Sequence, residues 1–118
     1  MTRKPIILIV DDIDLNRKML KIAMKRFGFD VLEACDGAEA LAILACCPTD
    51  LILMDCQMPI MDGLVATARI RARRCQTPII AYTTDDNRDE CLQVGMNDYL
   101  CKLAPLAELK GKLEFWLG

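Results

Sequence analysis

The chain has 118 residues, 53% of them hydrophobic and 27% charged, with a formal net charge of −2. That length suits one domain with one core, and the composition excludes a disordered chain. The lack of a basic block excludes the electrostatic footprint of nucleic-acid binding, and no apolar run is long enough for a membrane span. Because no signal peptide is recognisable, we expect residues 1–118 to form one cytoplasmic domain.

Short apolar runs at 6–10, 51–54 and 79–82 are typical of parallel strands that helices cover on both faces. After the first run, a helix is predicted by apolar residues at helical spacing, which we expect to face the core: Leu15, Met19, Ile22, Ala23 and Phe27. Gly28 is suited to end this helix before an edge strand at 31–32. A second helix is expected between the capping box of Asp36 and Glu39 and Pro48. Its inward residues would be Ala38, Leu41, Leu44 and Ala45.

The second half of the chain predicts two more helices around a short polar one. In the helix expected at 64–74, Leu64, Ala68 and Ile70 would point inward, and four arginines would lie largely in solvent: Arg69, Arg71, Arg73 and Arg74. A short polar helix is expected at 87–94, capped by Gly95 and followed by a strand at 98–102. The strongest amphipathic pattern predicts a final helix over 106–117, built on Leu106, Leu109, Leu113, Trp116 and Leu117. This repeated alternation predicts a doubly wound α/β fold with a parallel sheet and helices on both faces.

Polar side chains follow the predicted strands where each strand ends. Asp11 and Asp12 follow the first strand, Asp55 the third, Thr83 the fourth and Lys102 the last. In such sheets, function lies beyond the carboxyl ends of the central strands. Three carboxylates brought together repel one another and raise at least one pKa unless a cation neutralises them. An all-oxygen site of this kind suits Mg²⁺.

The same residue types fit the transfer of a phosphoryl group to a carboxylate. Asp55 would be the nucleophile, and a magnesium ion would bridge the nucleophile and the phosphoryl oxygens. Lys102 offers a positive charge and Thr83 a hydroxyl to the phosphoryl oxygens.

Four segments together resemble the receiver domain of bacterial two-component signalling. They are Ile-Leu-Ile-Val-Asp11-Asp12, Leu-Ile-Leu-Met-Asp55-Cys-Gln-Met-Pro59-Ile-Met-Asp-Gly63, Pro-Ile-Ile-Ala-Tyr-Thr83 and Gly95-Met-Asn-Asp-Tyr-Leu-Cys-Lys102. Their order and spacing span nearly the whole chain. The resemblance implies a flavodoxin-like five-stranded parallel sheet of order 2-1-3-4-5.

The resemblance also implies a function and its residues. Asp55 would accept a phosphoryl group from a phosphohistidine, with Asp12 binding Mg²⁺ directly, Asp11 through water and Gln57 through its main-chain carbonyl. Thr83 and Lys102 would contact the phosphoryl group, and Thr83 with Tyr99 would form the switch. The domain would be a phosphoacceptor that promotes its own phosphorylation and dephosphorylation, not an enzyme acting on a separate substrate. Its partner would be a histidine kinase or a histidine phosphotransfer domain, with a homodimer possible through the last two helices and strand.

Two other functions are compatible with parts of the sequence. Most receivers have proline after the active-site lysine, whereas Leu103 follows Lys102 here, so a degenerate receiver that only binds other proteins is one alternative. We expect a trans bond at this position, because a non-proline cis bond costs about 2.5–4 kcal/mol. The other alternative is a phosphatase of the haloacid-dehalogenase type, in which Asp12 of the Asp12-x-Asp14 pattern would be phosphorylated.

Seven cysteines are present, with no Cys-x-x-Cys pair and no histidine to complete a zinc site. We expect reduced and mostly buried thiols, with Cys56 packing in the core although it adjoins Asp55.

Overall fold

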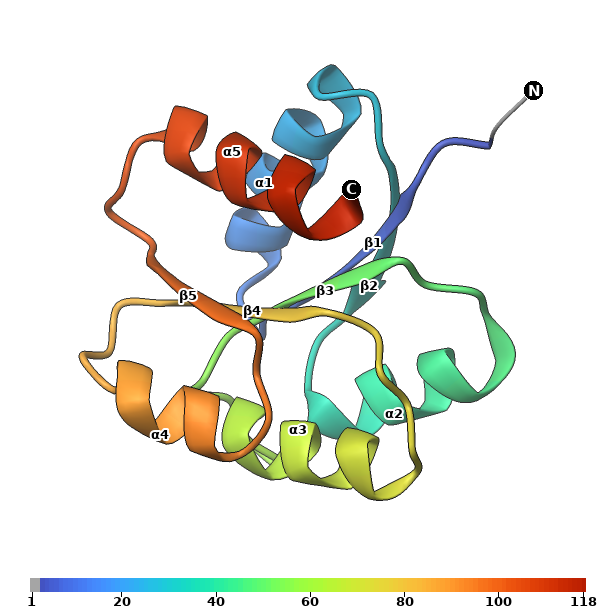
Figure 1. Ribbon diagram of the computed structural model, residues 1–118, viewed down its shortest axis with the longest axis vertical. Coiled ribbons are helices and arrows are strands. Elements are labelled where there is room, and N and C mark those ends of the chain that lie inside the picture. Colours follow the sequence, from blue (N-terminus) through green and yellow to red (C-terminus); the bar gives the residue numbers. More distant parts are fainter. Residues whose placement is uncertain (1–2) are drawn as a thin grey trace.

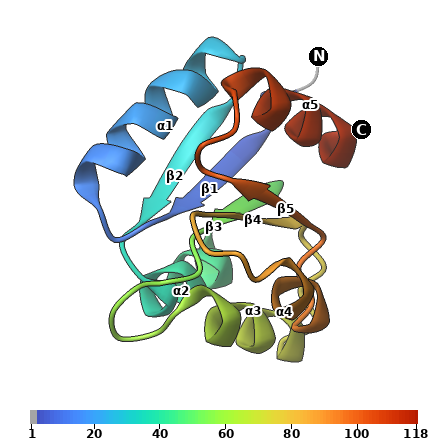
Figure 2. The same cartoon turned by 90° about the vertical axis from the view of Figure 1, so that its left-hand side faces the viewer.

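The computed structural model describes residues 3–118 and contains one parallel sheet of order β2-β1-β3-β4-β5. Helices α1 and α5 cover one face of the sheet, and α2, α3 and α4 cover the other (Figures 1 and 2). This is the expected flavodoxin-like fold. The elements are β1 (Ile6–Val10), α1 (Asp14–Arg26), β2 (Asp30–Ala34), α2 (Gly37–Cys46), β3 (Leu51–Met54), α3 (Gly63–Ala72), β4 (Ile79–Thr83), α4 (Arg88–Gln93), β5 (Asp98–Cys101) and α5 (Leu106–Leu117).

The core lies in two layers because successive side chains of a strand point to opposite faces. In β1, Ile7 and Ile9 pack under α1 and α5, whereas Leu8 and Val10 pack under the other three helices. Both faces of the central strands are therefore buried, which explains their unbroken apolar sequence. Among residues 3–118, no helix has the length and apolar character needed to cross a membrane.

The predicted core face of α1 is confirmed for Ala23, which is buried, and Phe27, which packs against the core, but it is wrong for its other three residues. Leu15, Met19 and Ile22 are 64%, 62% and 57% exposed, and the helix buries Leu20 and Met24 in their place. The helix carries two apolar stripes, and helical spacing detects both without distinguishing the one that meets the sheet. The first stripe remains as an apolar surface.

The predicted inward faces of α2 and α3 also need correction. In α2, Ala40 and Leu41 are buried, whereas Ala38 and Ala45 are exposed. In α3 the helix buries Ala66, Thr67 and Ile70, whereas Ala68 is exposed. Alanine is weakly apolar and tolerates either environment, so its spacing is a poor guide to orientation.

The start of α2 and the loop before α5 follow the sequence closely. Asp36 accepts a hydrogen bond from the Glu39 amide at 2.8 Å, and Glu39 reaches back to the amide of Cys35, one residue before the cap. All peptide bonds in residues 3–118 are trans, so the expected geometry between Lys102 and Leu103 is confirmed. The residue preceding α5 is Pro105.

The expectation of mostly buried cysteines is wrong. Cys56 and Cys91 are buried, Cys46 is exposed and the other four are partly buried. Cys56 packs in the core as expected, with its Sγ atom 3.4 Å from Sγ of Cys91 in α4.

Arg71 was expected in solvent, but it joins three segments of the chain. Its Nε donates to the Gly95 carbonyl at 2.9 Å, and one terminal nitrogen donates to the carbonyls of Cys75 and Thr77. The other terminal nitrogen donates to the Asn97 side chain at 2.8 Å. The guanidinium fork therefore ties the end of α3 to the turn before β5.

Replacing Arg71 by alanine leaves several of these acceptors without a donor. We expect the free energy of unfolding to fall by about 2–4 kcal/mol, measured by urea denaturation. Alanine at Arg69, which is exposed on the same helix, is the matched control and should change stability by no more than about 0.5 kcal/mol. Equal effects at the two positions would contradict the assigned role.

Asp98 connects β5 to α5. Its carboxylate accepts hydrogen bonds from Lys112 Nζ and Trp116 Nε1, both at 2.9 Å. Burial opposes ionisation of this group, but the hydrogen bonds from Trp116 and Lys112 outweigh it and lower the pKa of Asp98. The ionised form therefore stabilises the fold.

Asp98→Asn should destabilise the protein at neutral pH by about 1–3 kcal/mol, because the hydrogen bonds lose their charged acceptor. Because the pKa of Asp98 is lower in the folded protein than its unfolded value of about 3.8, the ionised group stabilises the folded protein at pH values above 3.8. This stabilisation is lost as the pH falls through the folded-state pKa. The difference in unfolding free energy between the two proteins should therefore shrink below that pH. A difference that is constant from pH 7 to 3 would count against the charge as its cause.

Candidate functional site

Five polar residues predicted from the strand ends meet at the carboxyl edge of the sheet. Asp11 and Asp55 are 1% and 8% exposed, whereas Asp12 is exposed. One carboxylate oxygen from each of these three residues lies within 4.8 Å of the others. The predicted cluster of carboxylates is therefore formed, and its donor set and spacing fit a magnesium ion.

Lys102 reaches this cluster in spite of the leucine that follows it. Its Nζ donates to Asp11 Oδ2 at 2.7 Å and to Asp55 Oδ2 at 3.2 Å. Its side chain is 17% exposed, so the ion pairs are shielded from water. The trans peptide bond thus permits the lysine geometry that the departure from the family pattern had placed in doubt.

The electrostatics of the cluster are dominated by burial. Burial raises the pKa of Asp55, the Lys102 ammonium opposes this rise, and the Asp11 charge adds to it. Burial lowers the pKa of Lys102, but the hydrogen bond that Lys102 donates to Asp11 and the charge of Asp55 outweigh it and raise that pKa. The lysine therefore stays protonated, while one cation does not suffice to lower the pKa of Asp55.

The backbone around Asp55 is fixed by close contacts. Its amide donates to the Val10 carbonyl at 3.0 Å, which aligns the ends of β3 and β1. After the turn, the Gly63 amide donates to the Cys56 carbonyl at 2.9 Å. A Cβ atom at Gly63 would lie 2.0 Å from the Asp55 carbonyl oxygen, so only glycine fits where α3 begins.

Two contacts to Asp11 were not foreseen from the sequence. Arg17 donates to the Asp11 carbonyl at 2.6 Å, and Asn16 Nδ2 lies 3.4 Å from Asp11 Oδ2. The Ile13 amide also donates to Asp11 Oδ1 at 2.9 Å. Both side chains come from the first turn of α1, a few residues after Asp11, and this closeness in the sequence is the feature that could have predicted the contacts.

Thr83 and Tyr99 are joined through one residue of the loop after β4. The buried Thr83 hydroxyl accepts a hydrogen bond from the Asp85 amide at 3.2 Å, and the Tyr99 hydroxyl donates to the Asp85 carbonyl. Gln57 lies two residues beyond Asp55 with its side chain exposed. The switch role of Thr83 and Tyr99 and the ligand role of the Gln57 carbonyl stay predictions.

A pocket of about 290 Å³ opens beside the carboxylate cluster. Asp11 and Lys102 form its polar side, and Met19 of α1 and Leu106 of α5 lie on its apolar side. The exposed stripe of α1 therefore borders the site.

Comparisons with known proteins agree with this geometry. The sequence model described as "Response regulator receiver domain" matches residues 7–114. The hybrid signal transduction protein dokA of Dictyostelium discoideum is 37% identical over 117 residues, which are 97% of this chain and 7% of dokA. This chain thus spans a small part of that relative.

Two solved structures are also similar. The receiver domain of the sensor histidine kinase PA1611 from Pseudomonas aeruginosa, solved with magnesium in its active-site cleft, is 38% identical with a TM-score of 0.91, covering 98% of this chain and 99% of that one. The Saccharomyces cerevisiae receiver domain of Ssk1, solved with the histidine phosphotransfer protein Ypd1, is 28% identical with a TM-score of 0.89. The alignment covers 98% of this chain and 90% of the matched one. The match over nearly all of the sequence, together with the shared fold, establishes that this chain belongs to the response regulator receiver domain family.

Proposed function

We propose that this domain accepts a phosphoryl group from a phosphohistidine onto Asp55, with Mg²⁺ as its cofactor. The observation that carries the proposal is the pairing of Lys102 with both Asp11 and Asp55 in a cluster of three carboxylates. A purely structural cluster of like charges would destabilise the fold, whereas a phosphoacceptor site requires it.

The metal would be held by Asp12 directly, Asp11 through water, Asp55 and the Gln57 carbonyl. When bound, Mg²⁺ neutralises charge between the nucleophile and the incoming phosphoryl oxygens. The all-oxygen donor set supports this assignment.

The chain's own residues would supply the remaining chemistry. An Asp55 carboxylate oxygen would form a bond to phosphorus as the bond between phosphorus and the donor histidine nitrogen breaks, and the donor imidazole would leave; strand β3 and the turn before α3 hold the Asp55 backbone in place for this attack. The Lys102 ammonium would exchange its hydrogen bonds to the carboxylates for an ion pair with a phosphoryl oxygen. The Thr83 hydroxyl would donate to another phosphoryl oxygen. Movement of Thr83 toward the phosphoryl group would break its hydrogen bond with the Asp85 amide and would also release Tyr99, whose hydroxyl donates to the Asp85 carbonyl.

Both alternatives are less well supported. A degenerate receiver was suggested by the missing proline after Lys102, but the lysine lies within hydrogen-bond distance of Asp55. A phosphatase that uses Asp12 is disfavoured because Asp12 is exposed and the Lys102 hydrogen bonds go to Asp11 and Asp55 instead.

The phosphodonor would dock on the exposed stripe of α1. Leu15, Met19 and Ile22 are each more than half exposed, and Leu106 across the pocket is 51% exposed. An apolar surface next to the acceptor carboxylate suits a helix that bears the donor histidine, because it positions the donor while leaving Asp55 accessible. The complex of Ssk1 with Ypd1 supports a histidine phosphotransfer protein as a partner of this kind.

Incubation with acetyl phosphate and Mg²⁺ should add one phosphoryl group, detected by intact-mass spectrometry. Asp55→Asn should abolish labelling because it removes the nucleophile, and Lys102→Ala should slow labelling by about 10²-fold because it removes the charge opposite the phosphoryl oxygens. Asp12→Asn should leave the acceptor Asp55 in place but weaken Mg²⁺ binding, so that labelling requires a higher Mg²⁺ concentration.

The reverse pattern would support the phosphatase alternative. In that case Asp12→Asn would abolish labelling, and Asp55→Asn would still be labelled. Unlabelled wild-type protein would support the degenerate receiver.

Docking on α1 predicts that Leu15→Glu combined with Met19→Glu slows transfer from phosphorylated Ypd1 by about tenfold or more, since a charge at a buried apolar contact costs at least about 1.4 kcal/mol. Labelling by acetyl phosphate should stay unchanged. Phe115→Glu, at an exposed apolar residue of α5 outside the pocket, is the control. Equal slowing with both donors would place the defect in the chemistry and not in docking.

A further inference from the structure

Helix α2 lacks the polar outer face that a surface helix normally has. It contains one charged residue, Glu39, and no other charge occurs before Asp50. Ala40 and Leu41 face the core, while the outer side is formed by exposed Ala38, Ala42, Ala45 and Cys46. A helix that is apolar on all sides is normally covered on all sides.

A hollow of about 220 Å³ lies between α2 and α3. Its lining consists of Leu41, Leu44, Ala45, Ile70, Arg73 and Cys75. This volume is below the roughly 300–1,000 Å³ of typical small-molecule sites. It suits a single apolar side chain of a partner, the usual form of an anchor at a protein interface.

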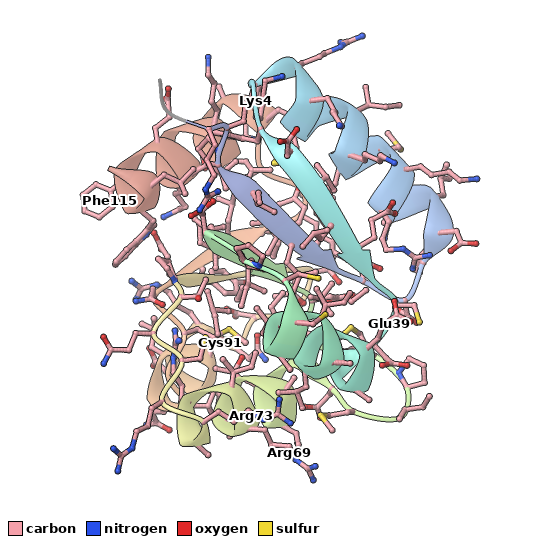
Figure 3. All side chains as sticks on the ribbon, turned by 90° about the vertical axis from the view of Figure 1, so that its right-hand side faces the viewer. Lys4, Glu39, Arg69, Arg73, Cys91 and Phe115 are labelled. Atoms are coloured by element: carbon pink, nitrogen blue, oxygen red, sulfur yellow. The ribbon has the colours of Figure 1, made fainter. Side chains whose placement is uncertain are left out.

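Positive charge without a counter-ion surrounds this hollow. Arg69, Arg73 and Arg74 are exposed, and within residues 3–118 none of them forms an ion pair. Arg69 projects from α3 into solvent (Figure 3), whereas Arg73 lines the hollow and donates to the Leu41 carbonyl of α2 at 3.3 Å. Their place near the C-terminal end of α3 favours positive charge only weakly, which does not account for three arginines.

We propose that this face, formed by the outer sides of α2 and α3, docks an acidic amphipathic helix of a partner protein. One apolar side chain of that helix would enter the hollow, and carboxylates beside it would pair with Arg69, Arg73 and Arg74. The small side chains along α2 allow two helices to approach closely. This face lies on the opposite side of the sheet from α1, so it is free while a phosphodonor occupies the site (Figure 1).

Two other occupants fit less well. A second copy placed symmetrically on the same face would bring the three arginines against their own copies, and like charges repel. An anionic membrane would suit the arginines, but surfaces that insert into membranes carry bulky aromatic and aliphatic side chains, whereas the outer side of α2 carries alanines.

The test uses a synthetic amphipathic peptide of leucine, alanine and glutamate, and a counterpart with lysine in place of glutamate. We expect the acidic peptide to shift the amide resonances of Leu44, Ala45 and Ile70, and to bind at least about tenfold more weakly to the Arg69→Glu, Arg73→Glu double variant. The lysine peptide should prefer that variant over the wild type. Arg88→Glu, an exposed arginine of α4, is the control and should bind the acidic peptide as the wild type does.

Urea denaturation of the double variant should still show a cooperative unfolding transition, with only a small shift of its midpoint from loss of the hydrogen bond between Arg73 and the Leu41 carbonyl, and this separates lost binding from lost folding. Equal binding of both peptides, unchanged binding by the double variant, or shifts confined to α1 and α5 would overturn the proposal. Binding to phosphatidylserine vesicles tests the alternative that the face docks on an anionic membrane. Binding to these vesicles without binding to the acidic peptide would replace the partner helix by a membrane surface.

Discussion

The shared ion pair between Lys102 and the carboxylates of Asp11 and Asp55 is the constraint on which the site depends. Its three members follow β1, β3 and β5, and these side chains come together only when the sheet is complete. Two buried carboxylates this close are unfavourable without a cation, because burial raises the energy of their charged forms. The Lys102 ammonium supplies this cation from the protein itself.

The sheet divides the molecule into two functional layers. The layer of α1 and α5 borders the carboxylate cluster, and Met19 of its exposed apolar stripe lines the pocket beside that cluster. The other layer contains α4 and the loop in which Asp85 joins Thr83 to Tyr99. Asp98, the residue before Tyr99, is held by α5. Tyr99 is thus hydrogen-bonded to the loop after β4, and its neighbour in β5 is hydrogen-bonded to a helix of the opposite layer.

Sequence reasoning located the fold and most of the site because both rest on robust physical signals. Strands buried on both faces are continuously apolar, as in residues 51–54, and parallel strands bring their carboxyl ends to one edge. It failed where two arrangements of a helix against the sheet agree equally well with the spacing of the apolar residues. The two apolar stripes of α1 are equally helical, and only the position of the sheet decides that Leu20 is buried and Met19 is not. Arg71 was missed because its acceptors, the carbonyls of Gly95, Cys75 and Thr77, are backbone atoms that no sequence pattern displays.

The contact between Gly63 and the backbone beside Asp55 closes the loop before α3 at its base. The chain leaves the end of β3 and returns to almost the same point, where the amide of Gly63 closes a ring on the carbonyl of Cys56. Residues 57–62 thus form an excursion whose two ends are already joined. Substitutions at its exposed tip, Pro59 and Ile60, can be absorbed within it, whereas its far end is held because the Met61 carbonyl accepts from the Gly37 amide and Asp62 caps α3. Receivers built this way can diversify the tip of this loop while the aspartate at the end of β3 stays in place.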